Sequence, residues 1–459
     1  MAKKKQIELT IEEKLRNALV PKEEQLYKIP SNWCWTYIHN IAIVVTGKTP
    51  SKKNKEYYGG KFPFFKPADL DAGRNMQYAT EYLSEKGKSI SVIIPEKSTG
   101  ICCIGTIGKC GYFLVEGTTN QQINTVISKI NPLYSYYFFN TNSFVRELIS
   151  KASATTIAIV NKSKLESCLF PVAPLNEQQR IVNRIESLFA KLDKAKELIE
   201  NTLAQFEQNK MAILHKAFTG ELTAKWRKEN NIDLSSWKEK TIDELCTSLK
   251  YGTSKKSNPE GSVVVLRMGN LQNGEIDWSN LMYTDDKDDI EKYLLKKGDV
   301  LFNRTNSPEL VGKTSIYRGE YPAIYAGYLI KLDYGKDIIG EYLNYMMNST
   351  KAKHYCYTVK TDGVSQSNIN AKKIGAFEIP VPTIEEQQEI VNILDKLLAK
   401  YNKIKNLEQQ LEKIELLKKA ILAKAFRGEL GTNNPDEESA ENLLKEILAE
   451  ERKNNDLYK

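Results

Sequence analysis

The sequence predicts a mixed α/β protein: two strand-rich α/β domains separated by a pair of long antiparallel coiled-coil helices, with a pseudo-twofold internal repeat. The first observation is that residues 171–185 (PVAPLNEQQRIVNRI) return as residues 380–394 (PVPTIEEQQEIVNIL), at an offset of 209. The second is that residues 215–222 (HKAFTGEL) return as residues 423–430 (AKAFRGEL), at an offset of 208. Self-similarity at a fixed period indicates one structural unit used twice.

The repeat also indicates where each copy begins, because residues 31–42 (SNWCWTYIHNIA) pair with residues 235–246 (SSWKEKTIDELC). In each copy a variable globular part precedes a better matched helical part. We therefore divide the chain into an N-terminal helical arm (1–30), a first variable domain (31–173), a first spacer helix (174–220), a linker (221–236), a second variable domain (237–381), a second spacer helix (382–429) and an acidic C-terminal helical tail (430–459).

Each spacer helix carries a heptad seam, in which apolar residues recur in steps of four and three. A seam of this length needs a partner, and pairing within one chain by a pseudo-twofold makes the helices antiparallel, with the variable domains at opposite ends. A coiled coil formed only between two copies of the chain is the alternative. The residues expected to pair the helices are Ile181, Ile185, Leu188 and Leu192 in the first helix and Ile390, Leu394, Leu397 and Tyr401 in the second.

Both spacer helices have recognisable start and stop signals. Asn176 is expected to cap the first helix, with Gln179 completing a capping box, and Thr383 with Glu386 is expected to do the same for the second. A glycine follows each helix, at Gly220 and at Gly428, where a left-handed terminator belongs. A helix between these signals is about 65 Å long.

The two variable domains consist of short β-type runs broken by Gly, Pro and Asn, with brief helical stretches between them. Beyond them, residues 436–452 (DEESAENLLKEILAEER) predict a helix with Leu443, Leu444, Ile447 and Leu448 on one face. This face is expected to dock on a partner or on the chain's own N-terminal helix, which begins near Thr10.

Composition excludes several classes of protein. No apolar run is long enough for a membrane span and the N-terminus lacks a secretory signal, so a cytoplasmic location is expected. The seven cysteines form no C-x-x-C pair and the three histidines lie far apart, so no metal is expected. The net charge is +8, and residues 429–459 carry −5, which leaves +13 on the rest of the chain. A basic body favours a polyanionic partner.

Catalytic motifs are missing. Two Gly-Lys-Thr triplets occur, at 47–49 and 312–314, but a phosphate-binding loop needs a glycine five residues earlier, where Ala42 and Ser307 stand. We find no dinucleotide-binding glycine motif, no adenine-methyltransferase motif and no spaced carboxylate–lysine set of a nuclease. No catalytic residue is predicted.

Recognition chemistry is present instead, at matched places in the two copies. A basic loop with neighbouring aromatics suits contact with phosphate, whereas Arg, Asn and Gln suit base edges. The candidates for DNA contact in the first domain are Lys48, Thr49, Lys52, Lys53, Lys55, Lys66, Asp69, Asn120, Gln121 and Gln122. Those in the second domain are Lys255, Lys256, Arg267, Asn270, Arg304, Asn306, Lys313, Ser365, Gln366 and Asn368. Each is also a residue type that braces turns or strand edges.

These features resemble the specificity subunits of type I restriction–modification systems over nearly the whole chain. The resemblance rests on the twofold P-x-x-x-x-E-Q-Q-x-I-V helix start, the twofold A-F-x-G-E-L helix end, the GKTPSKK loop (47–53) and the IPSNW segment (29–33). The second copy departs from it, with YGTSKK and no proline in the loop.

The resemblance implies a non-catalytic protein whose variable domains are target-recognition domains, each reading one half of a split double-stranded DNA target. Because the two domains differ, the target is expected to be asymmetric. The helices would set the spacing and, through the seam residues, dock two modification (methyltransferase) subunits; restriction and motor subunits would join the full complex, which needs this chain for both methylation and restriction. No cofactor is expected on this chain, and S-adenosylmethionine, ATP and Mg²⁺ are expected on its partners.

Two other classes remain as alternatives: a fused restriction–methylation enzyme or a fragment of one, and a coiled-coil scaffold that binds protein. The absent motifs argue against the enzyme. DNA affinity that falls steeply with salt would argue against the scaffold.

Overall fold

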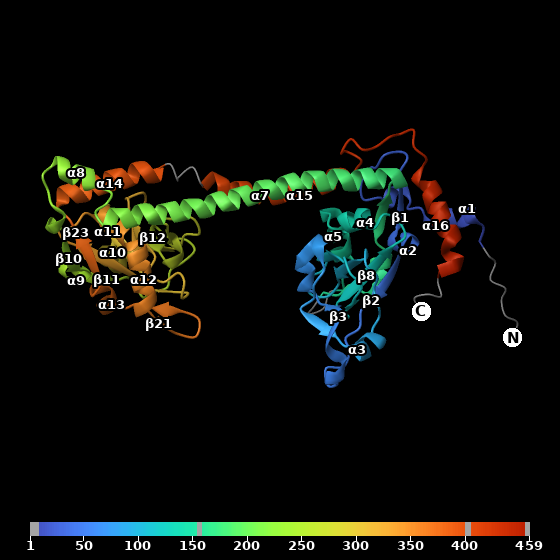
Figure 1. Ribbon diagram of the computed structural model, residues 1–459, viewed down its shortest axis with the longest axis horizontal. Coiled ribbons are helices and arrows are strands. Elements are labelled where there is room, and N and C mark those ends of the chain that lie inside the picture. The colour runs from blue at the N-terminus through green and yellow to red at the C-terminus, as the bar shows by residue number, and fades with distance from the viewer. Residues whose placement is uncertain (1–8, 154–157, 400–404, 455–459) are drawn as a thin grey trace. The chain divides into compact units, whose positions relative to one another are not determined.

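The computed structural model describes residues 9–153, 158–399 and 405–454 (Figure 1). Two compact units make up the chain. Unit 1 combines the residues up to Leu198 with those from Gln409 onward, and unit 2 is the continuous stretch Ile199–Glu408. Among the described residues, no helix is long and apolar enough to cross a membrane, and no cluster of His, Cys, Asp and Glu is arranged to hold a metal ion.

The first variable domain, in unit 1, is built on two small sheets. One is antiparallel, in the order β2 (Ala42–Thr46), β8 (Ile123–Ser128), β5 (Thr99–Cys102), β6 (Cys110–Tyr112). In the other, β3 (Tyr58–Phe65) lies between β4 (Glu81–Leu83), which is antiparallel to it, and β7 (Thr118–Thr119), which is parallel. A ribbon of β1 (Cys34–Tyr37) and β9 (Leu169–Val172) joins the first and last residues of the domain.

The second variable domain, in unit 2, repeats this topology strand for strand. Its antiparallel sheet runs β11 (Cys246–Tyr251), β20 (Leu329–Tyr334), β16 (Val300–Asn303), β18 (Thr314–Ile316). Its mixed sheet has β12 (Val263–Leu266) between β15 (Tyr283–Thr284) and β19 (Ala323–Tyr325), and its ribbon pairs β10 (Lys238–Thr241) with β23 (Glu378–Val381). The internal repeat is therefore confirmed.

Unit 2 adds two short β elements. A hairpin joins β13 (Leu271–Gln272) to β14 (Glu275–Ile276), and a small sheet has β22 (Ser367–Asn368) between β17 (Thr305–Asn306) and β21 (Thr361–Asp362). The short helices are α2 (Ile38–Ile41), α3 (Glu85–Ser89), α4 (Pro132–Phe139), α5 (Asn142–Ser150) and α6 (Lys162–Glu166) in unit 1, and α8 (Ala224–Glu229), α9 (Ile242–Leu245), α10 (Lys287–Tyr293), α11 (Gly340–Met347), α12 (Thr350–Val359) and α13 (Ala371–Gly375) in unit 2.

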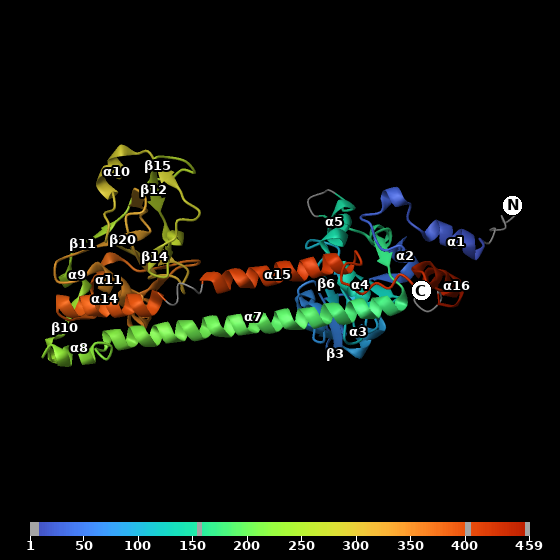
Figure 2. The same cartoon turned by 90° about the horizontal axis from the view of Figure 1, so that it is seen from above.

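The spacer helices are α7 (Leu175–Phe218) and, in the second copy, α14 (Ile384–Ala399) and α15 (Lys405–Ala425) (Figure 2). Within unit 1, Asp193 of α7 lies 2.6 Å from Lys418 of α15, and Lys196 lies 3.5 Å from Glu415. Residue numbers rise along one helix as they fall along the other, so the pair is antiparallel. Pairing within one chain is confirmed, and a seam formed only between copies is excluded.

Burial along the seam is greatest where the helices also contact a variable domain. Ile181 and Ile185 are wholly buried in the core of unit 1, and Ile390 and Leu394 are wholly buried in that of unit 2. Leu188, Leu192 and Leu397 are half-buried, as expected where only two helices meet. Tyr401 lies outside the described residues.

The predicted cap of the first spacer helix is wrong. Helix α7 begins at Leu175, and the Gln178 amide donates to the carbonyl of Pro174 at 3.0 Å, so Asn176 lies within the first turn. The side chain of Gln179 donates to Asn183 and closes no capping box. Pro174 stands where the second copy has Thr383; its ring offers no acceptor, but its fixed φ suits a helix start.

The other helix signals are largely confirmed. The Thr383 hydroxyl accepts the Glu386 amide at 3.4 Å, although the Glu386 carboxylate turns inward and closes no box. Gly220 and Gly428 have φ values of +81° and +74°, the left-handed conformation expected after a helix.

The first and last described helices pack together in unit 1. Helix α1 (Ile11–Ala18) contacts α16 (Ala440–Asn454), and their apolar faces bury Leu15 with Leu444, Ile447 and Leu448. The predicted apolar face of the tail therefore docks on the chain's own N-terminal helix, which was one of the two expected outcomes.

Candidate nucleic-acid interface

The repeated E-Q-Q motif fastens each variable domain to its spacer helix. In unit 2 the carboxylate of Glu386 is wholly buried and accepts hydrogen bonds from Thr223 (2.6 Å), Arg227 (2.6 Å) and the Trp237 indole (2.9 Å). We call Glu386, Thr223, Arg227 and Trp237 the second clasp. This structural role of the motif was not predicted from the sequence, although a tryptophan recurs at matched positions of the two copies, Trp33 and Trp237, and offered a signal.

Unit 1 has the matching first clasp, formed by Glu177, Trp33, Thr432 and Asn433. The buried Glu177 carboxylate accepts from the Trp33 indole at 2.8 Å, from Asn433 at 2.9 Å and from Thr432 at 3.4 Å. These donors are neutral, whereas the second clasp contains a buried ion pair.

The glutamine that follows each of these glutamates forms a hydrogen bond with a loop of the variable domain. Gln178 accepts from the Asn131 amide at 3.0 Å, and Gln387 accepts from the Ile339 amide at 2.8 Å. These two amides lie at the start of the matching helices α4 and α11. Each variable domain is therefore held in a fixed orientation to its own segment of spacer helix.

The A-F-x-G-E-L motif supplies an aromatic contact to the same two helices. The Phe426 ring lies 5.0 Å from that of Tyr134, and the Phe218 ring lies 5.3 Å from that of Tyr342. Both tyrosine hydroxyls donate to backbone carbonyls of the domain-closing ribbon, at Pro171 and Pro380. Both repeated motifs therefore serve the framework, which leaves the variable loops as the place for ligand contact.

The first basic loop follows β2 and lies against the loop after β7. The Lys48 amide donates to the Thr119 carbonyl at 2.9 Å, and the Thr49 hydroxyl donates to Gln121 at 2.5 Å. A Cβ at Gly47 would overlap the carbonyl oxygens of Thr119 and Asn120, so only glycine permits this approach. The structure brings these two sets of predicted residues together.

The cationic side chains of this loop point into solvent. All are exposed, and none forms an ion pair within the described residues: Lys48, Lys52, Lys53 and Lys55. Such ammonium groups are free to contact phosphate. Lys66 differs, because it lies 2.6 Å from Glu81.

Two other candidates of the first domain brace its loops. Asp69 is buried and accepts from the amides of Lys66 (2.7 Å) and Thr80 (3.0 Å). Asn120 is buried and exchanges hydrogen bonds with Gln122 through both ends of its amide. Because their polar atoms are occupied, we leave both residues out of the proposed DNA interface.

The second basic loop follows β11 at the equivalent place, and Gly252 makes the same close approach, to the Tyr325 carbonyl. One of its two lysines is less available for contact with phosphate. Lys255 lies 2.7 Å from Asp286 and 3.5 Å from Asp289, and the hydrogen bond to Asp286 raises the pKa of Lys255. Lys256 is exposed.

The Arg267–Asn270 turn repeats the Lys66–Asp69 turn. The buried Asn270 accepts from the Arg267 amide at 2.9 Å and donates to the carbonyls of Asp277 and Ser279. Arg267 donates to the Asn280 carbonyl at 2.7 Å. Asn270 is therefore a structural residue like Asp69, and we leave it out of the interface too.

Arg304 lies at the centre of a compact group in the second domain. Its guanidinium stacks over the Tyr251 ring at 4.8 Å and donates to the Gly327 carbonyl at 3.2 Å. The Arg304 amide donates to the carbonyl of Tyr328, whose side chain is exposed. Tyr251 and Tyr328 were not among the predicted residues, although each lies directly beside a loop glycine, Gly252 or Gly327.

All the remaining candidates except Lys256 and Lys313 lie near Arg304 along the chain or across the β17–β22 pair. Asn368 donates to the Thr305 hydroxyl at 2.7 Å, and Asn306 accepts the Ser307 amide, so both brace the β17–β22 pair. Ser365 and Gln366 are exposed in the loop between β21 and β22. Lys313 lies apart, hydrogen-bonded to Gln272, and its burial lowers its pKa.

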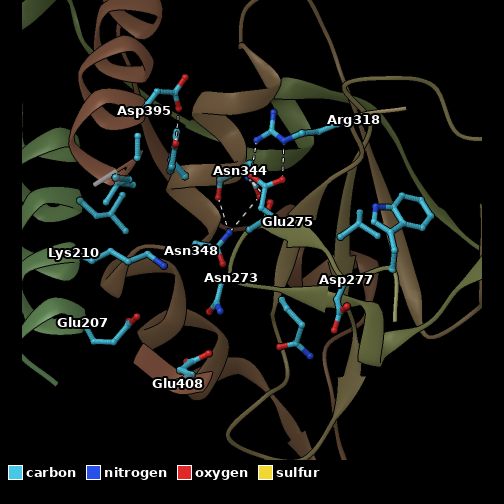
Figure 3. Close-up of a pocket in the computed structure, with 18 residues that line it drawn as sticks. Glu207, Lys210, Asn273, Glu275, Asp277, Arg318, Asn344, Asn348, Asp395 and Glu408 are labelled. Atoms are coloured by element: carbon cyan, nitrogen blue, oxygen red, sulfur yellow. Dashed lines mark hydrogen bonds and ion pairs between the residues drawn. The ribbon is translucent and has the colours of Figure 1, made fainter. Parts of the chain in front are cut away.

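A cavity of about 770 Å³ in unit 2 is unsuited to DNA. It is lined by the acidic side chains of Glu207, Glu275, Asp277, Asp395 and Glu408 (Figure 3). Its one arginine, Arg318, is held by Glu275 at 2.6 Å and by Glu341 at 2.6 Å. The surplus of negative charge would repel phosphate, so the exposed loops remain the better candidate.

Comparison with known proteins places the chain among DNA-specificity proteins. The model of the type I restriction modification DNA specificity domain matches it twice, over residues 30–204 and 235–416. The type I restriction enzyme EcoKI specificity subunit of Escherichia coli (strain K12) is 30% identical over 449 residues, covering 92% of this chain and 96% of that protein. The StySPI specificity subunit of Salmonella potsdam is 25% identical, with the same coverage.

A solved structure has the same fold. A chain in a study of complex assembly and conformational transition of the type I R-M system superimposes with a TM-score of 0.67 at 18% identity, covering 88% of this chain and all of that one. Both matched ranges of the sequence begin within a few residues of the clasp tryptophans, Trp33 and Trp237.

Proposed function

The chain belongs to the type I restriction–modification DNA specificity family, and on this premise we propose that each variable domain reads one half of a split, asymmetric DNA target. The chain is the DNA-recognition subunit of such a system and a non-catalytic one. The alternatives of a fused enzyme and of a protein-binding scaffold are therefore set aside.

The observation that carries the proposal is one framework bearing two different loop sets. The sheets and clasps of the two domains match, whereas four exposed lysines follow β2 and an Arg304–Tyr251 stack lies at the corresponding end of β11. A matched framework with unlike loops suits two different half-sites in one DNA molecule. Exposed lysines would contact phosphate, and the arginine and amide side chains would contact base edges.

DNA and other subunits of the complex are the partners of this chain. We propose further that two modification subunits dock along the spacer helices, and that these helices set the distance between the half-sites. The antiparallel pairing of α7 with α15 in unit 1, and the core that α7 and α14 share in unit 2, support this proposal. S-adenosylmethionine, ATP and Mg²⁺ would be bound by the partner subunits, which carry the chemistry of methylation and restriction, and the assembly would act in the cytoplasm.

A domain exchange tests the proposal. Residues 31–173 are replaced by the corresponding domain of a relative with a known target, and the methylated sites in cells that also produce the modification subunit are mapped by methylome sequencing. One half of the target should change and the other should persist. The matched control exchanges residues 237–381, which should change the opposite half. Alteration of both halves, or of neither, in either hybrid would contradict independent readers.

A further inference from the structure

The loop between β21 and β22 presents an exposed tip that joins an apolar side chain to polar ones. It consists of Gly363, Val364, Ser365 and Gln366, and the Val364 side chain is fully exposed, at 110% of its reference area. Ser365 and Gln366 beside it are exposed too. The tip thus offers one aliphatic group and two hydrogen-bonding groups to whatever approaches it.

The loop is held in one conformation although its strands are short. The Gly363 amide donates to the Gln366 carbonyl at 2.8 Å across the turn, and the Ser367 hydroxyl donates to Asp362. Lys373 donates to Thr361 at 2.7 Å, at the other end of β21. A two-stranded hairpin is barely stable by itself, and here the third strand, β17, supports it. A rigid tip loses little entropy when it binds.

The loop is also continuous with the Arg304 group. The Ile369 amide donates to the Arg304 carbonyl at 2.8 Å, and Thr305 pairs with Asn368 across β17 and β22. The Tyr251 hydroxyl, below the Arg304 stack, accepts the Ala371 amide at 2.9 Å. A cationic group and an aromatic group therefore stand behind the uncharged tip, within one small sheet and its flanks.

The groups that an A·T pair exposes in the major groove complement the amide and the aliphatic side chain of this tip. Adenine presents N7 as an acceptor and its N6 amino group as a donor, which a glutamine amide matches with two hydrogen bonds, and thymine presents a methyl group that an aliphatic side chain contacts. A G·C pair has no methyl group there. We infer that the loop 363–366 enters the major groove of the half-site read by the second domain and recognises an A·T pair, with Gln366 on adenine and Val364 against the thymine methyl.

This inference rests on the proposed function. It is tested by removing thymine methyl groups from the DNA one at a time, in combination with shortening of Val364 in the protein. Duplexes carry the target found by methylome sequencing, with each thymine of the second half-site replaced in turn by uracil, which lacks the methyl group. Binding is measured by fluorescence anisotropy with the complex of this chain and its modification subunits, made with the wild-type chain, Val364→Ala or the control Leu294→Ala, an exposed leucine of the same unit.

Replacement of one particular thymine by uracil should weaken DNA binding by the wild-type complex about fourfold, which corresponds to the loss of one buried methyl-sized group. Val364→Ala should lose a similar factor on the natural duplex and lose nothing more with uracil at that position, whereas Leu294→Ala should behave as the wild type. Gln366→Ala should weaken binding about fivefold or more, and much less when 7-deazaadenine, which lacks the N7 acceptor, occupies the paired position.

Three outcomes would overturn the inference: no thymine position coupled to Val364, a second half-site without an A·T pair, or a Val364→Ala variant that weakens subunit assembly instead of DNA binding. In each case specific binding of the natural duplex by the wild-type complex would still uphold the proposed function. Loss of that specificity would count against the proposed function itself.

Discussion

At the scale of single residues, the same side-chain chemistry serves two purposes, and only the structure separates them. Lys52 and Lys255 occupy matched loops, yet the first is unpaired within the described residues and the second lies beside Asp286 and Asp289. Asp69 and Asn270 brace matched turns. Bracing a turn and contacting DNA require the same donors and acceptors, so the sequence does not distinguish the two roles.

The lysines yield a prediction about salt. Lys52→Ala should lower the magnitude of the slope of log affinity against log salt by about 0.9, because each phosphate contact releases about one counterion from the DNA. Lys255→Ala should change the slope much less, since Asp286 already neutralises that ammonium group. Titrations of non-specific DNA at several salt concentrations measure both slopes. Equal slope changes in the two variants would refute the difference.

The clasps yield a prediction about stability. Glu386→Gln leaves the buried Arg227 without its counter-ion, and loss of a buried partner costs about 3–5 kcal/mol. Glu177→Gln changes a site whose donors are neutral, so its cost should be about 1–2 kcal/mol. Hydrogen exchange of the full chain, followed separately in units 1 and 2, would measure each cost where it arises. A larger loss in unit 1 from Glu177→Gln would contradict this ranking.

At the scale of elements, the heptad pattern predicted the antiparallel helix pair, because apolar periodicity reports directly which face is buried. The start of α7 was mispredicted, because Asn176 matches the cap preference while Pro174 takes the position. The strands β21 and β22 were not predicted as a hairpin, since strands of two residues carry no alternation to recognise.

The helix pair yields a prediction of its own. Leu192→Asp places a charge in a half-buried apolar seam, and it should destabilise unit 1 and weaken assembly with the modification subunits. The control Asp193→Ala removes only one partner of the exposed pair with Lys418 and should cost less than about 1 kcal/mol. Urea unfolding and co-purification with the modification subunit measure the two effects. An unchanged midpoint in Leu192→Asp would contradict the importance of the seam.

At the scale of the whole molecule, the repeat made the fold predictable, because one unit recognised twice fixes the topology of both halves. The DNA contacts were less predictable, since each domain carries its own loops on that shared topology. The absence of catalytic motifs in the sequence agrees with the chain being a non-catalytic subunit.

That conclusion predicts the behaviour of the isolated chain. The purified protein, given S-adenosylmethionine, ATP and Mg²⁺, should neither methylate nor cleave DNA and should not hydrolyse ATP. Methylation should appear when the modification subunit is added, as measured by incorporation of labelled methyl groups. Methylation, cleavage or ATP hydrolysis that co-purifies with the chain in the absence of partner subunits would contradict the assignment.

The first clasp also has a bearing on the order in which the chain folds during synthesis. Unit 2 is continuous in sequence, and it holds both Glu386 and the Thr223–Trp237 stretch that satisfies it. The first 198 residues of unit 1 are made before unit 2, but their contacts with Thr432, Asn433 and Leu444 form only after those residues leave the ribosome. A chain cut short before residue 432 leaves Glu177 buried with fewer donors, at a cost of about 1–3 kcal/mol. The first-made variable domain therefore gains these contacts only after residues 432–448 have been synthesised, which leaves a shorter nascent chain more open to proteolysis.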